Sequence, residues 1–253
     1  MVYKSYIFLN ILFIFGLFLY FITFNFSIDF QDIFYLFFSL FGMIVPATIY
    51  LNGYIYKDRE EEKSYKFLFL GFFIYGLANL IWYLNEILML EISINYLNLL
   101  FIFQIFTKHY FLKYLNFNRE GLSFFKVFNT IFSINVLILL ISMFVGFYIN
   151  LNSFIVDLYY VFESLVSIIF IFYFLREKYP SHIDIYHFGY GNLVWFLADI
   201  LFLTEVIAGN YFMGNLADFS YFIGFYFMLS SIIYKDFSSQ KIDLTLTKNL
   251  SFT

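Results

Sequence analysis

The sequence contains no cysteine, only two prolines and few charged residues. The absence of cysteine excludes disulfides, thiolate nucleophiles and thiolate metal sites, and it leaves the redox compartment undefined. Only 13% of the 253 residues are charged and 62% are hydrophobic, whereas ordinary soluble domains have about 25% charged and 45–50% apolar residues. A water-soluble core cannot bury that much apolar surface, so the composition predicts an integral membrane protein.

The sequence also lacks the short motifs that usually carry catalysis or nucleotide binding. It has no Walker loop, no glycine-rich dinucleotide fingerprint and no G-x-S-x-G nucleophile elbow. Its three histidines are not spaced as metal ligands on a helix, and its basic residues form no patch that would suggest nucleic acid. We therefore expect a non-enzymatic protein with no catalytic residue, no metal, no cofactor and no nucleic-acid partner.

Long hydrophobic runs dominate what is present. A helix needs about 20 mostly apolar residues to cross about 30 Å of hydrocarbon. Eight stretches qualify, near residues 6–26, 32–55, 66–90, 95–113, 126–149, 154–175, 185–206 and 215–235. The most polar connection, residues 56–63, is expected to be a charged loop outside the bilayer. The sequence thus predicts an all-α fold, an integral membrane bundle of eight transmembrane helices.

All fourteen basic residues fall on one side of this predicted arrangement. They are Lys4, Lys57, Arg59, Lys63, Lys66, Lys108, Lys113, Arg119, Lys126, Arg176, Lys178, Lys235, Lys241 and Lys248. The opposite loops, near residues 27–31, 91–94, 150–153 and 207–214, contain none. Because Lys and Arg accumulate in short cytoplasmic loops, this partition supports the helix count. It predicts a multi-pass protein of the cell membrane with cytoplasmic N- and C-termini.

Two segments of the chain repeat earlier ones. Residues 32–40 return as residues 157–165, and residues 76–86 (GLANLIWYLNE) return as residues 189–199 (GYGNLVWFLAD). The second match places the only two tryptophans at equivalent positions. We therefore expect two parallel four-helix repeats, residues 1–122 and 123–236, followed by a short cytoplasmic tail, residues 237–253. In transporters built from parallel repeats, substrate sites tend to lie between the halves.

The second repeated segment carries a polar stripe, Asn-x-x-Trp-x-x-x-acid, at residues 79–86 and again at residues 192–199. Positions with this spacing share one face of a helix. An acid within the hydrocarbon is costly and usually faces the bundle interior or water, and Glu163 in the sixth predicted helix also lies at such a depth. The candidate ligand-binding residues are Glu86, Asp199, Asn79, Asn192, Trp82, Trp195 and Glu163.

The expected ligand is a cation or a small amine, because the predicted outer side carries acids and no basic residue, which concentrates negative potential there. The other acids on that side are Asp29, Asp32, Glu91, Asp157, Glu205 and Asp218. The alternative interpretation is structural. On that interpretation the acids are solvated loop and helix-end residues, the tryptophans anchor helices near the membrane interface, and the asparagines tie helices together by hydrogen bonds.

One part of the chain resembles a known group of proteins. Gly-x-x-Asn-Leu-x-Trp-x-Leu-x-acid at residues 189–199, followed by Ala217-Asp218-Phe219-x-Tyr221, resembles the multi-pass N-terminal regions of some prokaryotic histidine kinases and diguanylate cyclases. The resemblance covers residues 185–235, with a fainter match over residues 70–113. It implies an input module that senses a membrane or small-molecule signal. Fewer than twenty residues follow Lys235, so we expect any output to come from a cytoplasmic signalling partner.

Two functions fit these observations. The first is a non-enzymatic, sensor-like or accessory membrane module with an acid-lined, outward-facing site between its repeats. The second is a small secondary transporter or channel for a cation or an amine-bearing solute. An intramembrane enzyme, the third alternative, would need carboxylates that converge within hydrogen-bond reach.

Overall fold

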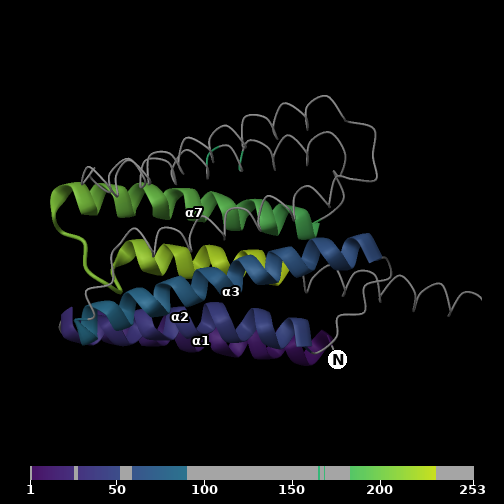
Figure 1. Cartoon of the computed structure of the whole chain (residues 1–253), viewed down its shortest axis with the longest axis horizontal. Helices are drawn as coiled ribbons and strands as arrows, with labels where there is room; N and C mark the ends of the chain where they lie inside the picture. Colours follow the sequence, from purple (N-terminus) through teal and green to yellow (C-terminus); the bar gives the residue numbers. More distant parts are fainter. Residues whose placement is uncertain are drawn as a thin grey trace, which may run out of the picture. The chain divides into compact units, whose positions relative to one another are not determined.

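The computed structural model describes residues 2–25, 28–51, 59–89, 165, 168 and 183–231 (Figure 1). The elements in these ranges are helices: α1 (Val2–Asn25), α2 (Ile28–Leu51), α3 (Arg59–Leu88), α7 (Ile183–Ala208) and a helix over residues 216–231. The prediction of an all-α fold is confirmed for this part of the chain. The predicted spans near 95–113, 126–149 and 154–175 lie outside the described residues, apart from residues 165 and 168, which are helical. The predicted repeat boundaries near 122 and 236 also lie outside them.

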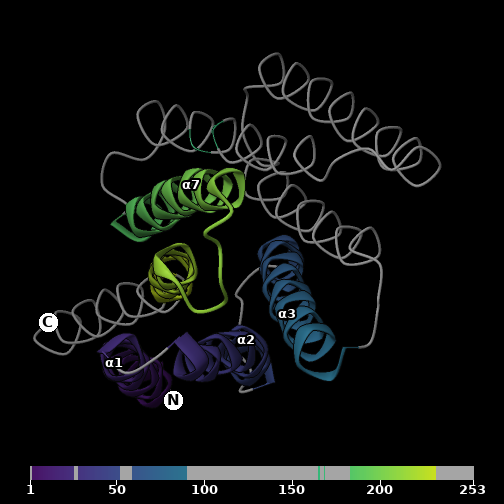
Figure 2. The ribbon, with the colours of Figure 1, turned by 90° about the vertical axis from the view of Figure 1, so that its left-hand side faces the viewer.

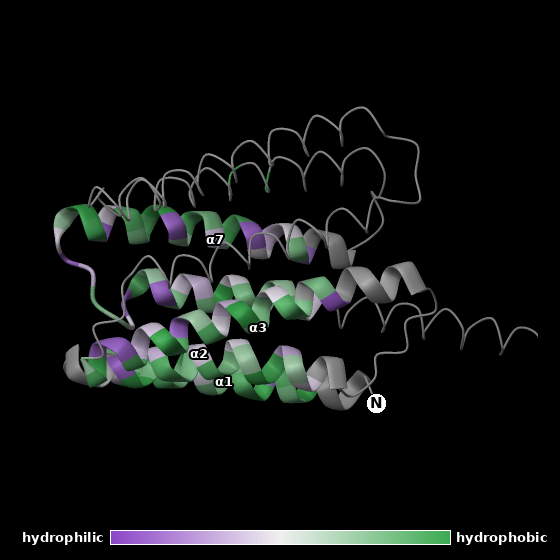
Figure 3. Cartoon of the chain, viewed as in Figure 1, coloured by the Kyte–Doolittle hydropathy of each residue, from purple (hydrophilic) through white to green (hydrophobic). Residues whose placement is uncertain are grey.

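Among the described residues, two helices are long and apolar enough to cross a membrane, over Tyr6–Asn25 in α1 and His187–Ala208 in α7. A shorter apolar stretch, Asp32–Thr48, lies in α2. In Figure 3 the visible ribbon of α1 is coloured mostly as hydrophobic, whereas isolated hydrophilic positions interrupt α7. These lengths and compositions agree with membrane association.

Helix α3 begins earlier than its apolar stretch. The prediction that residues 56–63 form a charged loop is wrong from Arg59 onward, because α3 starts at that residue. Glu, Lys and Arg are good helix formers, and acidic residues in a first turn interact favourably with the helix dipole. The helix can therefore extend through a segment that is too polar for the hydrocarbon.

The chain divides into two compact units. The terminal unit comprises Met1–Phe34 and Val161–Thr253, and the central unit comprises Tyr35–Tyr160. In the terminal unit, the helix over residues 216–231 lies between α1 and α7 (Figures 1 and 2). This helix therefore has one face toward each of its two neighbours.

Aromatic stacking joins the 216–231 helix to α1. The ring of Tyr226 stacks on Phe13 and that of Phe219 stacks on Tyr20, each pair at a centroid distance of 3.8 Å. The Tyr226 hydroxyl also donates a hydrogen bond to Asn10 Oδ1 at 2.7 Å. One face of α1 thus packs within the protein.

The remaining surface of α1 includes many exposed large apolar side chains, among them Ile11, Ile14, Phe15, Phe18 and Phe21. Such a continuous apolar patch is typical of a membrane-facing surface.

Glycine contacts bring helices together in both units. In the terminal unit, a Cβ on Gly224 would lie 2.4 Å from Trp195 Cδ1 and 2.8 Å from the Gly191 carbonyl oxygen. In the central unit, a Cβ on Gly76 of α3 would lie 2.7 Å from the carbonyl carbon of Gly42 in α2. Small residues at such positions let helix backbones approach closely, which is how helices commonly pack in membranes.

A short hairpin connects α7 to the 216–231 helix. Gly209 ends α7 with φ of 69°, and its N–H donates to the Val206 carbonyl at 3.1 Å. The N–H of Asn210 donates to the Glu205 carbonyl at 2.9 Å. These two bonds form a Schellman motif, which satisfies carbonyls at the helix end and reverses the chain. The hairpin places the next helix directly against α7.

Candidate functional site

The stripe on α7 is buried. Asn192, Trp195 and Asp199 are 1%, 5% and 8% exposed. They lie on the face of α7 that packs on the 216–231 helix, because their spacing follows the helical period and because each contacts a side chain or carbonyl of that helix. A buried acid in a helix apolar enough to cross a membrane is a candidate functional residue.

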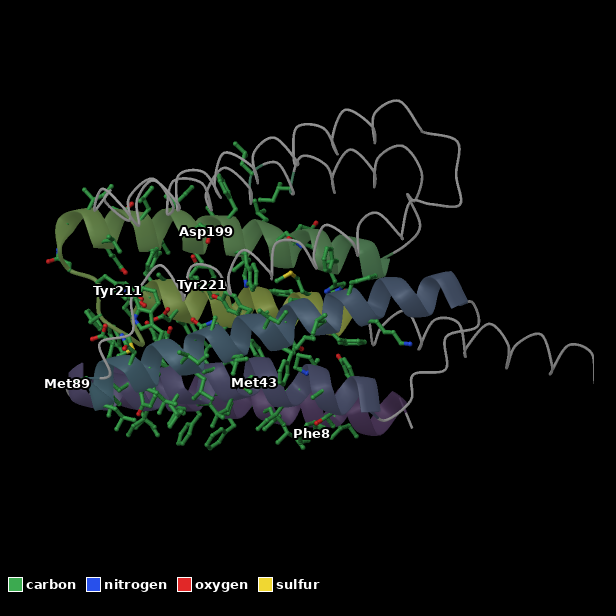
Figure 4. All side chains as sticks on the ribbon, in the orientation of Figure 1. Phe8, Met43, Met89, Asp199, Tyr211 and Tyr221 are labelled. Carbon is green, nitrogen blue, oxygen red and sulfur yellow. The ribbon has the colours of Figure 1, made fainter. Side chains whose placement is uncertain are left out.

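Tyr221 links two members of this stripe (Figure 4). Its hydroxyl donates a hydrogen bond to Asp199 Oδ1 at 2.5 Å, and its backbone carbonyl accepts one from Trp195 Nε1 at 3.0 Å. The two rings meet edge to face with centroids 5.9 Å apart. A phenol that donates to a carboxylate makes a strong, charge-assisted hydrogen bond. The donor groups of Trp195 and Tyr221 are therefore both engaged within the protein.

The side-chain amide of Asn192 is hydrogen-bonded at its nitrogen but not at its oxygen. Its Nδ2 donates to the Phe188 carbonyl at 2.8 Å and approaches Met228 Sδ at 3.4 Å. Its Oδ1 is buried and accepts no hydrogen bond from any residue that the structure describes. Rotating the amide by 180° would place Oδ1 against the Phe188 carbonyl oxygen, so the hydrogen-bond pattern supports this orientation. A buried acceptor without a donor costs about 1–3 kcal/mol.

The stripe on α3 is only partly buried. Asn79 is buried, and its Oδ1 accepts a hydrogen bond from the Tyr35 hydroxyl at 2.8 Å. Its Nδ2 donates to the Tyr75 carbonyl at 2.9 Å. Trp82 is half-buried, and Glu86, in the last turn of α3, is exposed. In α3, therefore, both ends of the asparagine amide are hydrogen-bonded, one of them to α2, and the acid lies at the surface.

The candidate residues therefore fall into separate groups. Asn192, Trp195 and Asp199 are brought together in the terminal unit, whereas Asn79, Trp82 and Glu86 belong to the central unit. Glu163 lies outside the described residues. No group of three or more His, Cys, Asp or Glu side chains placed to hold a metal ion occurs within the described ranges. Among the candidate residues, the stripe on α7 is the part with a buried acid and a buried acceptor on the same helix face.

A second polar cluster caps the 216–231 helix. Asn215 Oδ1 accepts hydrogen bonds from the N–H groups of Ala217 at 3.0 Å and Asp218 at 3.2 Å, as an N-cap residue does. The Asn215 side-chain amide also donates to the Glu205 carboxylate. Asp218 in turn accepts from the Gly214 N–H at 2.7 Å.

This cap corrects one interpretation of the outer acids. Asp218 is 3% exposed, so the expectation that it is a solvated helix-end residue is wrong. Its burial is possible because the Gly214 N–H and the Tyr211 hydroxyl, 3.4 Å from each carboxylate oxygen, surround it with donors. Glu205 and Asp218 therefore hold the hairpin through these hydrogen bonds.

Two hydrogen-bond partners of the candidate residues were missed from the sequence. Tyr35 and Tyr221 supply the hydroxyls that reach Asn79 and Asp199. Tyr221 closes the motif at residues 217–221, and Tyr35 lies in the repeated segment 32–40. Both signals marked the residues without showing which side chain each would contact, since helical spacing identifies neighbours only within one helix.

No protein-family model matches the chain, and no curated protein or solved structure matches it either. A function has to be argued from the site itself.

Proposed function

We propose that the chain is a multi-pass membrane protein of eight transmembrane helices, arranged as two parallel four-helix repeats with both termini in the cytoplasm. Four observations support this proposal. They are the hydrophobic composition, the one-sided distribution of all fourteen basic residues, the apolar length of α1 and α7, and the exposed apolar surface of α1. The protein acts as a non-enzymatic, sensor-like or accessory module.

The ligand-receiving part of this module is the stripe on α7. The observation that carries this proposal is the burial of Asp199, 8% exposed, in a helix apolar enough to cross a membrane. A carboxylate at such a position costs about 2.5–3.5 kcal/mol on insertion scales. A cation or an amine is the ligand whose charge offsets that cost.

The test is ligand-dependent thermal stabilisation of the full chain in detergent. The panel consists of sodium, potassium, phenethylamine and tyramine, measured on wild type, Asp199→Asn and Glu86→Gln. We expect at least one cation or amine to raise the unfolding temperature of wild type and Glu86→Gln and to leave that of Asp199→Asn unchanged. Glu86→Gln is the matched control, because it removes the equivalent acid from the exposed position on α3. Equal responses of all three proteins would refute a site at Asp199.

A small secondary transporter or channel is the second candidate function. It is favoured by the same acid, because intramembrane carboxylates also mark ion and substrate pathways. The panel that identifies a binding cation or amine can be used in proteoliposomes. Flux above background that depends on Asp199 would favour transport, whereas binding with background flux of cations, amines and protons would favour sensing.

A further inference from the structure

One face of α3 is exposed along the helix. Leu70, Phe73 and Leu84 are exposed, whereas Phe72 and Tyr75, on the opposite face, are buried. The helical period places the three exposed side chains on one side, because they are separated by close to whole turns. In a helix that crosses a membrane, such an apolar face is suited to contact with lipid tails.

The charged residues of α3 lie at the two ends of its apolar stretch. Residues 67–85 contain no charged side chain, and a helix over them extends about 28 Å at 1.5 Å per residue. This length is close to the hydrocarbon thickness of about 30 Å. Lys66 precedes the stretch and Glu86 follows it. Because α3 begins at Arg59, about two helical turns lie before Phe67 and outside the hydrocarbon, where the lipid headgroups begin.

Three basic residues in these two turns continue the exposed face. Arg59, Lys63 and Lys66 are spaced i, i+4 and i+7, which places them on one side of the helix. Leu70 and Phe73 follow on the same side, four and seven residues after Lys66. Lys66 is exposed, as are the two apolar side chains. The face therefore changes from basic to apolar at the edge of the hydrocarbon.

The acids of the same segment are distributed around the helix. Glu60 and Glu61 fall about 100° and 200° from Arg59, and Glu62 borders the basic face. Residues 59–66 contain three basic and three acidic residues in total. On the exposed side, however, three basic residues stand against one acid. The excess of positive charge there comes from the arrangement of the residues and not from the composition of the segment.

We propose that this face of α3 binds the headgroups of anionic phospholipids in the cytoplasmic leaflet through Arg59, Lys63 and Lys66, while Leu70 and Phe73 contact the acyl chains. The inference rests on the proposed arrangement of the chain in the membrane. Basic residues next to a membrane span attract anionic lipids, and their long apolar stems lie along the hydrocarbon edge. Lys66 also interacts within the protein, but an ammonium group has three donors and can contact a lipid phosphate as well.

The test uses a single label, because the chain contains no cysteine of its own. A bimane fluorophore is attached to Leu70→Cys of the full chain in phosphatidylcholine vesicles. Phosphatidylglycerol or phosphatidylcholine with brominated acyl chains, which quench a fluorophore in contact, is then added at rising mole fraction. We expect half-maximal quenching at a mole fraction about fivefold lower for brominated phosphatidylglycerol, because the basic residues attract the anionic headgroup. The preference should fall as the salt concentration rises.

A charge exchange within α3 tests the arrangement of the residues. It moves two basic residues off the exposed face and keeps the net charge and composition of the segment, so the positive-inside bias that sets the topology is unchanged. The four substitutions are Arg59→Glu, Glu60→Arg, Glu61→Lys and Lys63→Glu. The matched control, Lys57→Asp with Asp58→Lys, exchanges charges before α3 begins. We expect the exchange in α3 to abolish the preference and the control to retain it.

A label at Phe8→Cys in α1 is the positional control. Phe8 is exposed and follows Lys4 as Leu70 follows Lys66, but Lys4 is the single basic residue of α1. We expect a clearly smaller preference for phosphatidylglycerol at this position. An equal preference at both labels would show a general attraction of the cytoplasmic surface and would overturn a site on α3.

The remaining outcomes separate this inference from the proposed membrane arrangement. Equal quenching of the Leu70→Cys label by both lipids would leave α3 in the bilayer and overturn the headgroup site. Failure of both lipids to quench that label would overturn the lipid-facing placement of α3 as well. The preference in the protein with native charges is measured without any charge variant, so poor folding of the exchange variant does not prevent the test.

Discussion

Asn79 on α3 and Asn192 on α7 occupy the same position of a repeated sequence pattern, yet their amide oxygens have opposite hydrogen-bond states. The Asn79 oxygen accepts the Tyr35 hydroxyl at 2.8 Å, whereas the Asn192 oxygen is buried and accepts nothing from the described residues. Both amide nitrogens donate to the carbonyl four residues earlier in their own helix. The difference therefore comes from the neighbouring helix and not from the stripe itself.

The two acids differ in the same way. Glu86 lies in the last turn of α3 and is exposed, whereas Asp199 lies well before the end of α7 and is 8% exposed. The hairpin after α7 reverses the chain, so the 216–231 helix packs on the face of α7 that carries the stripe. Tyr221 of that helix contacts Asp199. The same motif therefore has a hydrogen-bonded amide oxygen at Asn79, whereas the amide oxygen of Asn192 on α7 accepts no hydrogen bond from the described residues.

The largest expected effect comes from separating α7 from its neighbour. Gly224→Ala places a Cβ 2.4 Å from Trp195 Cδ1 and 2.8 Å from the Gly191 carbonyl oxygen, and the backbone at Gly191 cannot yield as a side chain can. We expect a loss of about 2–3 kcal/mol in the free energy of unfolding, typical of overpacked contacts. Denaturation in detergent followed by circular dichroism measures it.

The control for this substitution is Gly209→Asn. Gly209 has φ of 69° and no neighbouring atom within 4 Å of an added Cβ, and asparagine tolerates the left-handed conformation better than other residues do. We expect a clearly smaller loss for Gly209→Asn. Equal losses would mean that the close contact of Gly224 with Trp195 and Gly191 has no special role.

The next effect tests the two asparagines directly. Asn79→Leu removes the acceptor of the buried Tyr35 hydroxyl, so we expect a loss of about 1–2 kcal/mol in unfolding free energy. Asn192→Leu removes a buried oxygen that accepts no hydrogen bond from the described chain, so we expect a change of less than about 0.5 kcal/mol. The same denaturation measurement applies to both. A larger loss for Asn192→Leu than for Asn79→Leu would show that the α7 oxygen is satisfied in the unliganded protein.

The sequence predicts helices better than it predicts contacts between them. The extents of α1 and α7, and the start of the 216–231 helix, follow from hydropathy to within a few residues, because apolar length is a property of the segment alone. The start of α3 at Arg59 was missed because helix propensity continues where hydropathy ends.

In the candidate site too, the sequence predicts features within one helix but not contacts between helices. Helical spacing places Asn192, Trp195 and Asp199 on one face, and that face is buried. Spacing cannot show that Tyr221 reaches Asp199, because the contact depends on how the hairpin turns. The burial of Asp218 depends likewise on the hairpin, because the Gly214 N–H donates to its carboxylate at 2.7 Å. Contacts of this kind depend on how two elements are placed relative to each other. A sequence pattern within one element does not contain that information.

The smallest expected effect is at Glu86, and it sharpens the comparison of the acids. Glu86→Gln keeps the size and the hydrogen-bonding oxygen of an exposed side chain and removes only its charge. Substitutions at such positions usually change stability by less than about 0.5 kcal/mol. Tyr221→Phe, which removes the hydroxyl that donates to Asp199 at 2.5 Å, is the comparison on α7, and hydrogen bonds to charged groups contribute about 1.5–3 kcal/mol. If Glu86→Gln destabilised the protein as much as Tyr221→Phe, the acid on α3 would have a buried partner of its own, and the contrast between the two stripes would fail.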